Sequence, residues 1–183
     1  MPLALPIVGD RVVVDRFADA DTAALSRSHS DPGNARYQDW RFPLSEADAR
    51  SFIDDQQGIE VIAPGEAVQL ALRETEAGPL AGDVYLARSK DTPTEVEVGI
   101  TLVPGFHGRG LATRGIAALV HALRGDGVAP PALRRVVAIV EVGNDRSRAL
   151  FERLGFQVDG RLEGERDGRD GTPVDEIVYD LEI

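Results

Sequence analysis

The chain has 183 residues, 43% hydrophobic and 28% charged, which is typical of a globular protein with one domain over residues 1–183. Cysteine is absent, so disulfides, thiolate metal sites and a cysteine nucleophile are excluded, and a cytoplasmic protein is expected. The net charge of −11 argues against nucleic-acid binding and suits a cationic partner, although it also serves solubility, and no apolar run predicts a membrane segment.

The first part of the chain predicts a strand, a helix and a long loop. Val12–Val14 indicate a strand within residues 11–17, and aspartates from position 19 begin a helix that runs to about residue 28. Proline and glycine predict a loop over residues 29–44. Tyr37 and Trp40 on this loop are candidates to line a substrate cleft; the alternative is that they close the edge of the core.

A second helix and a hairpin follow. Ser45 opens a near capping box, with Asp48 in place of the usual glutamate or glutamine, for a helix to about residue 57. Residues 67–74 and 80–88 alternate as strands around a turn, so they predict an antiparallel hairpin.

The fourth strand leads directly into a glycine loop. Residues 95–102 alternate with strand period, Pro104 ends the strand, and Gly108 and Gly110 precede a helix with an apolar stripe from Leu111 onward. A glycine turn that opens a helix presents unpaired backbone N–H groups, so this stretch predicts a phosphate-binding site.

The C-terminal part predicts a loop, a buried strand, a helix and a final strand pair. The loop covers residues 125–131. Residues 133–142 predict a strand, in which Val136–Val140 are apolar on both faces, as in a central strand. Asn144 can cap a helix through about residue 154, and strands follow at 156–166 and 174–183. The sum is a mixed α/β sheet of about seven strands with about four helices.

Three kinds of glycine loop compete at this site. A Walker loop requires a Gly-Lys pair, which the chain lacks. A dinucleotide loop requires a third glycine where Thr113 stands, and it belongs near the first strand rather than the fourth.

The third kind fits best. The stretch His107–Ala112 resembles the Gln/Arg-x-x-Gly-x-Gly/Ala signature of the GNAT acetyltransferase superfamily, with histidine as the departure. The stretch Asn144–Phe156 resembles the Asn-x-x-Ser…Lys-Leu-Gly-Phe pattern of its RimJ/RimL-like branch. The resemblance covers nearly the whole chain and implies a GNAT fold, mostly antiparallel, whose fourth and fifth strands splay apart.

The resemblance also implies acetyl-CoA as cosubstrate and no metal. The backbone of the glycine loop would hold the pyrophosphate, Arg109 and Arg114 would add charge, and the pantetheine arm would lie along the fourth strand. The cofactor-binding candidates are therefore Thr101, Leu102, Val103, His107, Gly108, Arg109, Gly110, Leu111, Ala112, Thr113, Asn144 and Ser147. The alternative for Arg109 and Arg114 is that each is a solvated surface residue. The alternative for Asn144 is that it only caps its helix.

Acetyl transfer to an amine requires a neutral amine and a protonated leaving thiolate. Glu97 is the candidate base, directly or through water, and Ser147 the candidate donor, because Phe151 stands where many GNAT enzymes carry a tyrosine. The alternative for Glu97 is an exposed or salt-bridged strand residue. The alternative for Ser147 is a serine that hydrogen-bonds the backbone of its own helix turn. Tyr179 and Tyr85 are reserve donors.

The resemblance implies an acyl-CoA-dependent N-acyltransferase that acts by direct attack in a ternary complex, and the absence of cysteine is consistent with this. The acceptor is a primary amine: either a basic protein N-terminus, as in ribosomal proteins, or a small cationic amine or antibiotic. A binding module that senses acyl-CoA without turnover is the alternative from another class. A homodimer would be common for such relatives.

Overall fold

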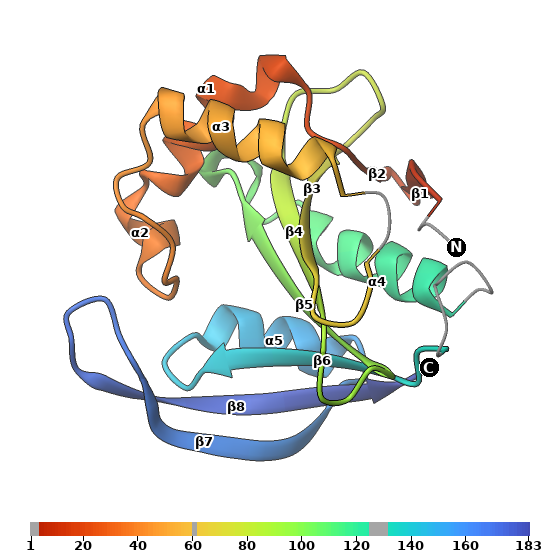
Figure 1. Cartoon of the computed structure of the whole chain (residues 1–183), viewed down its shortest axis with the longest axis vertical. Coiled ribbons are helices and arrows are strands. Elements are labelled where there is room, and N and C mark those ends of the chain that lie inside the picture. Colours follow the sequence, from red (N-terminus) through yellow and green to blue (C-terminus); the bar gives the residue numbers. More distant parts are fainter. Residues whose placement is uncertain (1–3, 60–61, 125–131) are drawn as a thin grey trace.

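The strands of the protein form one sheet, seen in the computed structural model, which describes residues 4–59, 62–124 and 132–183. The strand order is β1-β2-β3-β4-β5-β6-β8-β7, and every neighbouring pair is antiparallel except β5–β6 (Figure 1). The strands are β1 (Ile7–Gly9), β2 (Val12–Asp15), β3 (Ala67–Arg73), β4 (Gly82–Arg88), β5 (Glu95–Leu102), β6 (Arg135–Glu141), β7 (Gln157–Asp167) and β8 (Pro173–Glu182).

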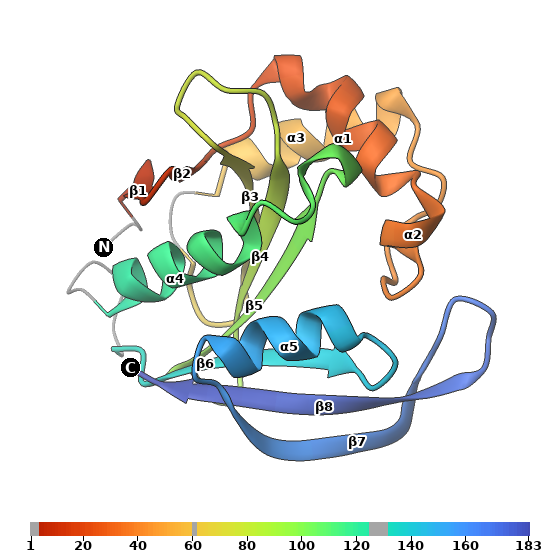
Figure 2. The same ribbon diagram turned by 180° about the vertical axis from the view of Figure 1, so that it is seen from behind.

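Helices cover both faces of the sheet. In Figures 1 and 2, α1 and α3 lie on one face, and α4 and α5 on the other. The helices are α1 (Thr22–His29), α2 (Pro32–Ala35), α3 (Glu46–Gln57), α4 (Leu111–Leu123) and α5 (Asp145–Arg153), with 3₁₀ turns η1 (Asp19–Asp21) and η2 (Pro104–Phe106).

Each helical layer has its own apolar core. The stripe of α4, including Ile116 and Leu119, packs on strand residues such as Leu72 in the larger core. Leu25 of α1 and Ile53 of α3 pack against the opposite face in the smaller core. In each core the apolar side chains recur with helical period along the helix and with a period of two along the strand, so each element has one apolar face that packs on the other.

The sheet opens between β5 and β6. These two parallel strands pair only over Glu95–Glu97 with Arg135–Val137. Beyond that point β5 continues to Leu102 and β6 to Glu141, and the two ends diverge around α5 (Figure 2). The predicted splay of the fourth and fifth strands is confirmed and is here the splay of β5 and β6.

The counts of elements differ from the sequence prediction. The sheet has eight strands rather than seven, because three residues, Ile7–Gly9, pair with β2 across a tight turn in which Arg11 has φ 50°. The fifth helix, α2, lies in the predicted loop 29–44, where Asp31 accepts a hydrogen bond from the Asn34 amide. Both elements are too short for a periodic signal. The predicted loop 125–131 lies outside the described residues.

Candidate active site

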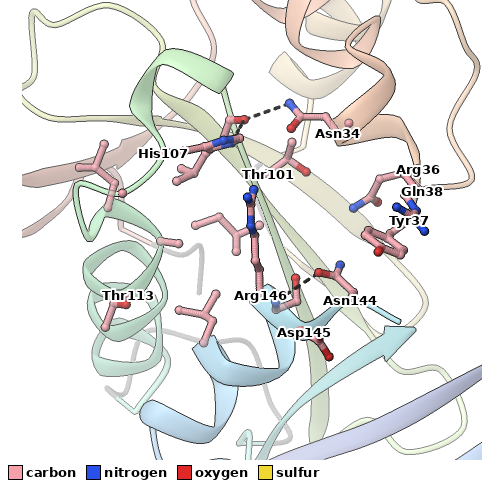
Figure 3. A pocket seen from close by; sticks show the side chains of 18 of the residues that line it. Asn34, Arg36, Tyr37, Gln38, Thr101, His107, Thr113, Asn144, Asp145 and Arg146 are labelled. Carbon is pink, nitrogen blue, oxygen red and sulfur yellow. Dashed lines mark hydrogen bonds between the residues drawn. The ribbon is translucent and has the colours of Figure 1, made fainter. Parts of the chain in front are cut away.

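A cavity of about 1130 Å³ fills the space between the diverging strands (Figure 3). Four parts of the chain surround it: the segment after α1, the end of β5, the glycine loop with the first turn of α4, and the start of α5. The lining residues are Gly33, Asn34, Arg36, Tyr37, Gln38, Ile100, Thr101, Leu102, His107, Gly108, Gly110, Leu111, Ala112, Thr113, Gly143, Asn144, Asp145, Arg146, Ser147, Leu150 and Arg153.

The glycine loop has the backbone that an anion site requires. Gly108 and Gly110 have φ 77° and 72°, in the left-handed region that glycine tolerates best. The Arg114 amide is bonded to the Gly110 carbonyl at 3.1 Å, one full turn into the helix. The N–H groups of the preceding turn, 111–113, have no partner within an α-helix, and the helix dipole adds positive potential there.

The cavity is basic although the chain is acidic. Arg36, Arg146 and Arg153 line it, and among the described residues Asp145 is its one acidic lining residue. The guanidinium of Arg153 lies 3.5 Å from the Thr113 hydroxyl, so it bridges α5 to the first turn of α4. An anionic ligand is therefore favoured at the end of the cavity formed by the glycine loop and Arg153.

The start of α5 places Asn144 and Ser147 on the cavity. The Asn144 side chain accepts from the Ser147 amide at 3.3 Å, which makes it the N-cap of the helix. None of the hydrogen bonds found for residues 4–59, 62–124 and 132–183 uses the Ser147 hydroxyl, which leaves it free to contact a ligand.

Neither tyrosine proposed as a reserve donor lines the cavity. Tyr179 is fully buried beside Phe151, and its hydroxyl donates to Glu152 at 2.9 Å. Burial raises the pKa of Tyr179. Tyr85 lies beside Glu97 instead, where burial, then Glu97 and Asp39, raise its pKa.

Glu97 lies on β5 outside the cavity lining, among acidic neighbours. Burial is the largest cause that raises its pKa, and the charges of Glu176 and Asp39 raise it further. We call Asp39, Glu97 and Glu176 the carboxylate cluster. Arg166 pairs with Glu176 at 2.9 Å and so offsets part of its negative charge. Along β5, Glu97 and the cavity residue Thr101 are on the same face, about 13 Å apart at 3.3 Å per residue.

The two aromatic residues of the predicted loop separate. Tyr37 lines the cavity, and its hydroxyl donates to the Gly143 carbonyl at 2.9 Å, across the opening of the sheet. Trp40 stacks on His29 with ring centroids 3.9 Å apart and donates to the His29 carbonyl at 3.1 Å. Trp40 is not among the lining residues.

Three other predicted residues, Val103, Arg109 and Arg114, also lie off the cavity, and the Arg114 guanidinium donates to the Arg109 carbonyl at 3.0 Å. The Arg109 guanidinium lies 3.3 Å from Glu74 and 4.9 Å from the centroid of the Phe106 ring. Val103 packs against the smaller core. In this structure the side chains of Arg109 and Val103 contact groups outside the cavity.

Sequence reasoning missed several lining residues, among them Asn34, Arg36, Gln38, Arg146 and Arg153. Asn34 donates to the Leu102 carbonyl at 3.0 Å, and His107 lies 3.1 Å from the same oxygen. Arg146 and Arg153 stand inside the stretch Asn144–Phe156 that resembles the family pattern, and this position could have identified them as lining residues. The loop residues carried none.

Within the described ranges, no group of three or more histidine or acidic side chains is arranged to hold a metal ion. None of the helices there is long and apolar enough to cross a membrane.

The protein family described as "Acetyltransferase (GNAT) domain" matches residues 11–157 of this chain. Among curated proteins, YdaF of Bacillus subtilis (strain 168), provisionally named a ribosomal N-acetyltransferase, is 30% identical over 105 residues. That match covers 57% of this chain and 51% of YdaF, so the chain spans about half the length of this relative. YoaA of the same organism, an uncharacterized N-acetyltransferase, is 24% identical over 94% of this chain and 93% of YoaA.

Solved structures share the fold. An acetyltransferase of the GNAT family from Bacillus anthracis has a TM-score of 0.82 at 18% identity, over 97% of this chain and 98% of that one. RimL, a ribosomal L7/L12 α-N-protein acetyltransferase in complex with coenzyme A, has a TM-score of 0.75 at 18% identity, over 100% of this chain and 97% of RimL. Spermidine N-acetyltransferase from Vibrio cholerae, in complex with CoA and spermine, has a TM-score of 0.74 at 17% identity, over 94% of this chain and 95% of that one.

Proposed function

Because the chain belongs to the GNAT acetyltransferase family, we propose that it transfers acetyl from acetyl-CoA to a primary amine of a basic protein N-terminus. The similarity to YdaF supports the RimJ/RimL-like branch and hence an acceptor of the ribosomal-protein kind. One observation carries the proposal: β5 joins a basic cavity at its end to the carboxylate cluster near its middle. An anionic donor and a cationic acceptor would meet along this strand.

The residues of the cavity fit coenzyme A. Its pyrophosphate and 3′-phosphate would lie at the turn 108–113, where backbone N–H groups, the helix dipole and Arg153 favour anions. A Cβ added at Gly108 would meet nothing within 4 Å, so the space beside this loop is open. The acyl arm would lie along β5 near Thr101, with Asn144 and Ser147 across the opening.

The transfer exchanges one bond for another. The amine nitrogen attacks the carbonyl carbon of the thioester, the carbon–nitrogen bond forms, and the carbon–sulfur bond breaks. The amine must lose a proton first. Glu97, whose pKa is raised, would accept it through a chain of waters, because about 13 Å of strand separates Glu97 from Thr101. The Ser147 hydroxyl would donate a hydrogen bond or a proton to the departing thiolate.

A second acceptor class is favoured by the carboxylate cluster itself. Three carboxylates close enough to raise the pKa of one of them attract a polycationic small amine as well as a basic peptide. The fold shared with the spermidine enzyme is compatible with this class. Acetyl as the acyl group, a cytoplasmic location and a homodimer stay predictions.

Thiol release from acetyl-CoA, with basic peptides and with polyamines as acceptors, tests the proposal. Turnover with peptides above polyamines supports the N-terminal acceptor, and the reverse order supports the small amine. Tight CoA binding without turnover on any amine would instead favour a binding module. Propionyl- and succinyl-CoA in the same assay define the donor.

A further inference from the structure

Residues 31–42, which we call the crossing segment, join the two arms of the open sheet. On the β5 side, Asn34 donates to the Leu102 carbonyl at 3.0 Å. On the α5 side, Tyr37 donates to the Gly143 carbonyl at 2.9 Å. In Figure 3 the residues of this segment lie on the side of the cavity opposite α4. The segment thus forms the cavity wall that lies across from α4.

Arg169, in the turn between β7 and β8, binds the crossing segment with a single guanidinium. It donates to the carbonyls of Ala35 and Gln38 at 2.8 Å each and of Trp40 at 2.9 Å. Its charge lies 5.1 Å from the centroid of the Phe42 ring. Hydrogen bonds from a charged donor are stronger than neutral ones, and the rigid plane of arginine fixes the three carbonyls relative to each other.

The held carbonyls flank Asp39. Its side chain is exposed, and no hydrogen bond or ion pair within the described residues holds it. Its negative charge contributes to the raised pKa of Glu97 and of Tyr85, so it lies within electrostatic reach of both. The position of Asp39 therefore depends on its backbone, which Arg169 fixes on both sides through Gln38 and Trp40.

We infer that Arg169 is a positioning residue for the amine acceptor: through the carbonyls of Gln38 and Trp40 it fixes the backbone on both sides of the exposed Asp39 carboxylate. The inference rests on the proposed function, since it assigns the carboxylate cluster to the acceptor. Hydrogen bonds from Arg169 reach only the crossing segment, and none of those found reaches the glycine loop or α5. The donor's phosphates would lie at the glycine loop, so Arg169 should affect the donor less than the acceptor, and only through the residues of the crossing segment that line the cavity.

The test compares three variants in steady-state transfer with each substrate varied in turn. Arg169→Ala should lower kcat/KM for the amine on the order of tenfold, as expected when a positioning group is lost. The KM for acetyl-CoA should change less than the KM for the amine, because, in the part of the chain that the structure describes, the glycine loop and α5 are not held by Arg169. Arg169→Lys should fall between the two, because an ammonium cannot meet three carbonyls in one plane. Arg161→Ala is the matched control: it removes an arginine of the same hairpin, one whose partner Asp175 is 2.5 Å away.

Two outcomes would overturn the inference. One is an Arg169→Ala protein with unchanged kcat/KM for the amine. The other is an equal loss for both substrates with a fall in Tm, without rescue by lysine, which would indicate a purely structural role.

Hydrogen exchange separates this inference from the proposed function. Arg169→Ala should speed amide exchange across residues 35–42 without any substrate present, whereas Arg161→Ala should not. If the wild type acetylates no amine, the proposed function fails, and unchanged exchange in Arg169→Ala would refute the positioning role separately.

Discussion

The two sides of the proposed site differ in charge and in the kind of group that supplies it. At the cavity, backbone N–H groups of a helix start and arginines on α5 give a positive environment. At the carboxylate cluster, side chains from the crossing segment, β5 and β8 give a negative one. Both lie on β5, so the open sheet allows an anionic and a cationic ligand to approach one strand without sharing an electrostatic environment.

The difference also concerns how each side is held. The glycine loop is local: its geometry follows from neighbouring residues and from the first turn of α4. The carboxylate cluster gathers residues 39, 97 and 176, which are far apart in sequence, and one of them depends on Arg169. The acceptor side is therefore the side that changes in distant elements should affect more.

The largest expected effect is on the negative side. Glu97→Gln should lower kcat by about 10²–10⁴-fold, which is the usual contribution of a general base, with little change in the KM for acetyl-CoA. Steady-state thiol release measures both. Glu95→Gln is the control, since Glu95 stands two residues earlier on β5 and pairs with Arg135 at 3.6 Å. Full activity of Glu97→Gln would mean that another group takes the proton.

The next effect should fall on the positive side. Arg153→Ala should weaken CoA binding about tenfold or more, because a hydrogen bond to a charged group contributes roughly 1.5–3 kcal/mol. Arg109→Ala, whose guanidinium is engaged by Glu74 and Phe106, should change it little. Calorimetric titration with CoA at two salt concentrations measures the difference. Equal losses in the two variants would show that Arg109 turns toward the ligand.

Ser147→Ala should have a smaller effect that separates binding from chemistry. Loss of one neutral hydrogen bond to the leaving group costs about 1 kcal/mol, or roughly fivefold in kcat, while affinity for CoA is kept. Single-turnover rates and a CoA titration on the same sample decide the point. A weaker CoA titration with an unchanged rate would assign Ser147 to the cofactor arm.

The smallest expected effect is a shift in pH dependence. Burial and neighbouring carboxylates raise the pKa of Glu97, so the neutral acid persists to higher pH and kcat/KM should fall on the acid side above the usual glutamate range. Asp39→Asn removes one negative charge, lowers that pKa and should move the acid limb to lower pH. The profile of the wild type beside Asp39→Asn provides the measurement. A limb that moves the other way would contradict an electrostatic effect of Asp39 on Glu97.

Much of this protein follows from its sequence because the relevant signals are local. The alternation of residues 95–102, the glycines at 108 and 110, and the Asn144 cap each depend on near neighbours, and the structure confirms the elements they predict. The family motifs likewise placed the splay at the fourth and fifth strands, where β5 and β6 pair over only three residues each.

The tertiary structure alone decided which residues meet across the opening. Nothing near Arg169 in the chain indicates that it binds carbonyls about 130 residues away, and nothing near Trp40 indicates that it stacks on His29 rather than on a ligand. The glycine loop is formed by neighbours in sequence and by the backbone's own hydrogen bonds, whereas the acceptor wall exists only where separate elements pack together. Local rules fix the first, and only the packed fold can fix the second.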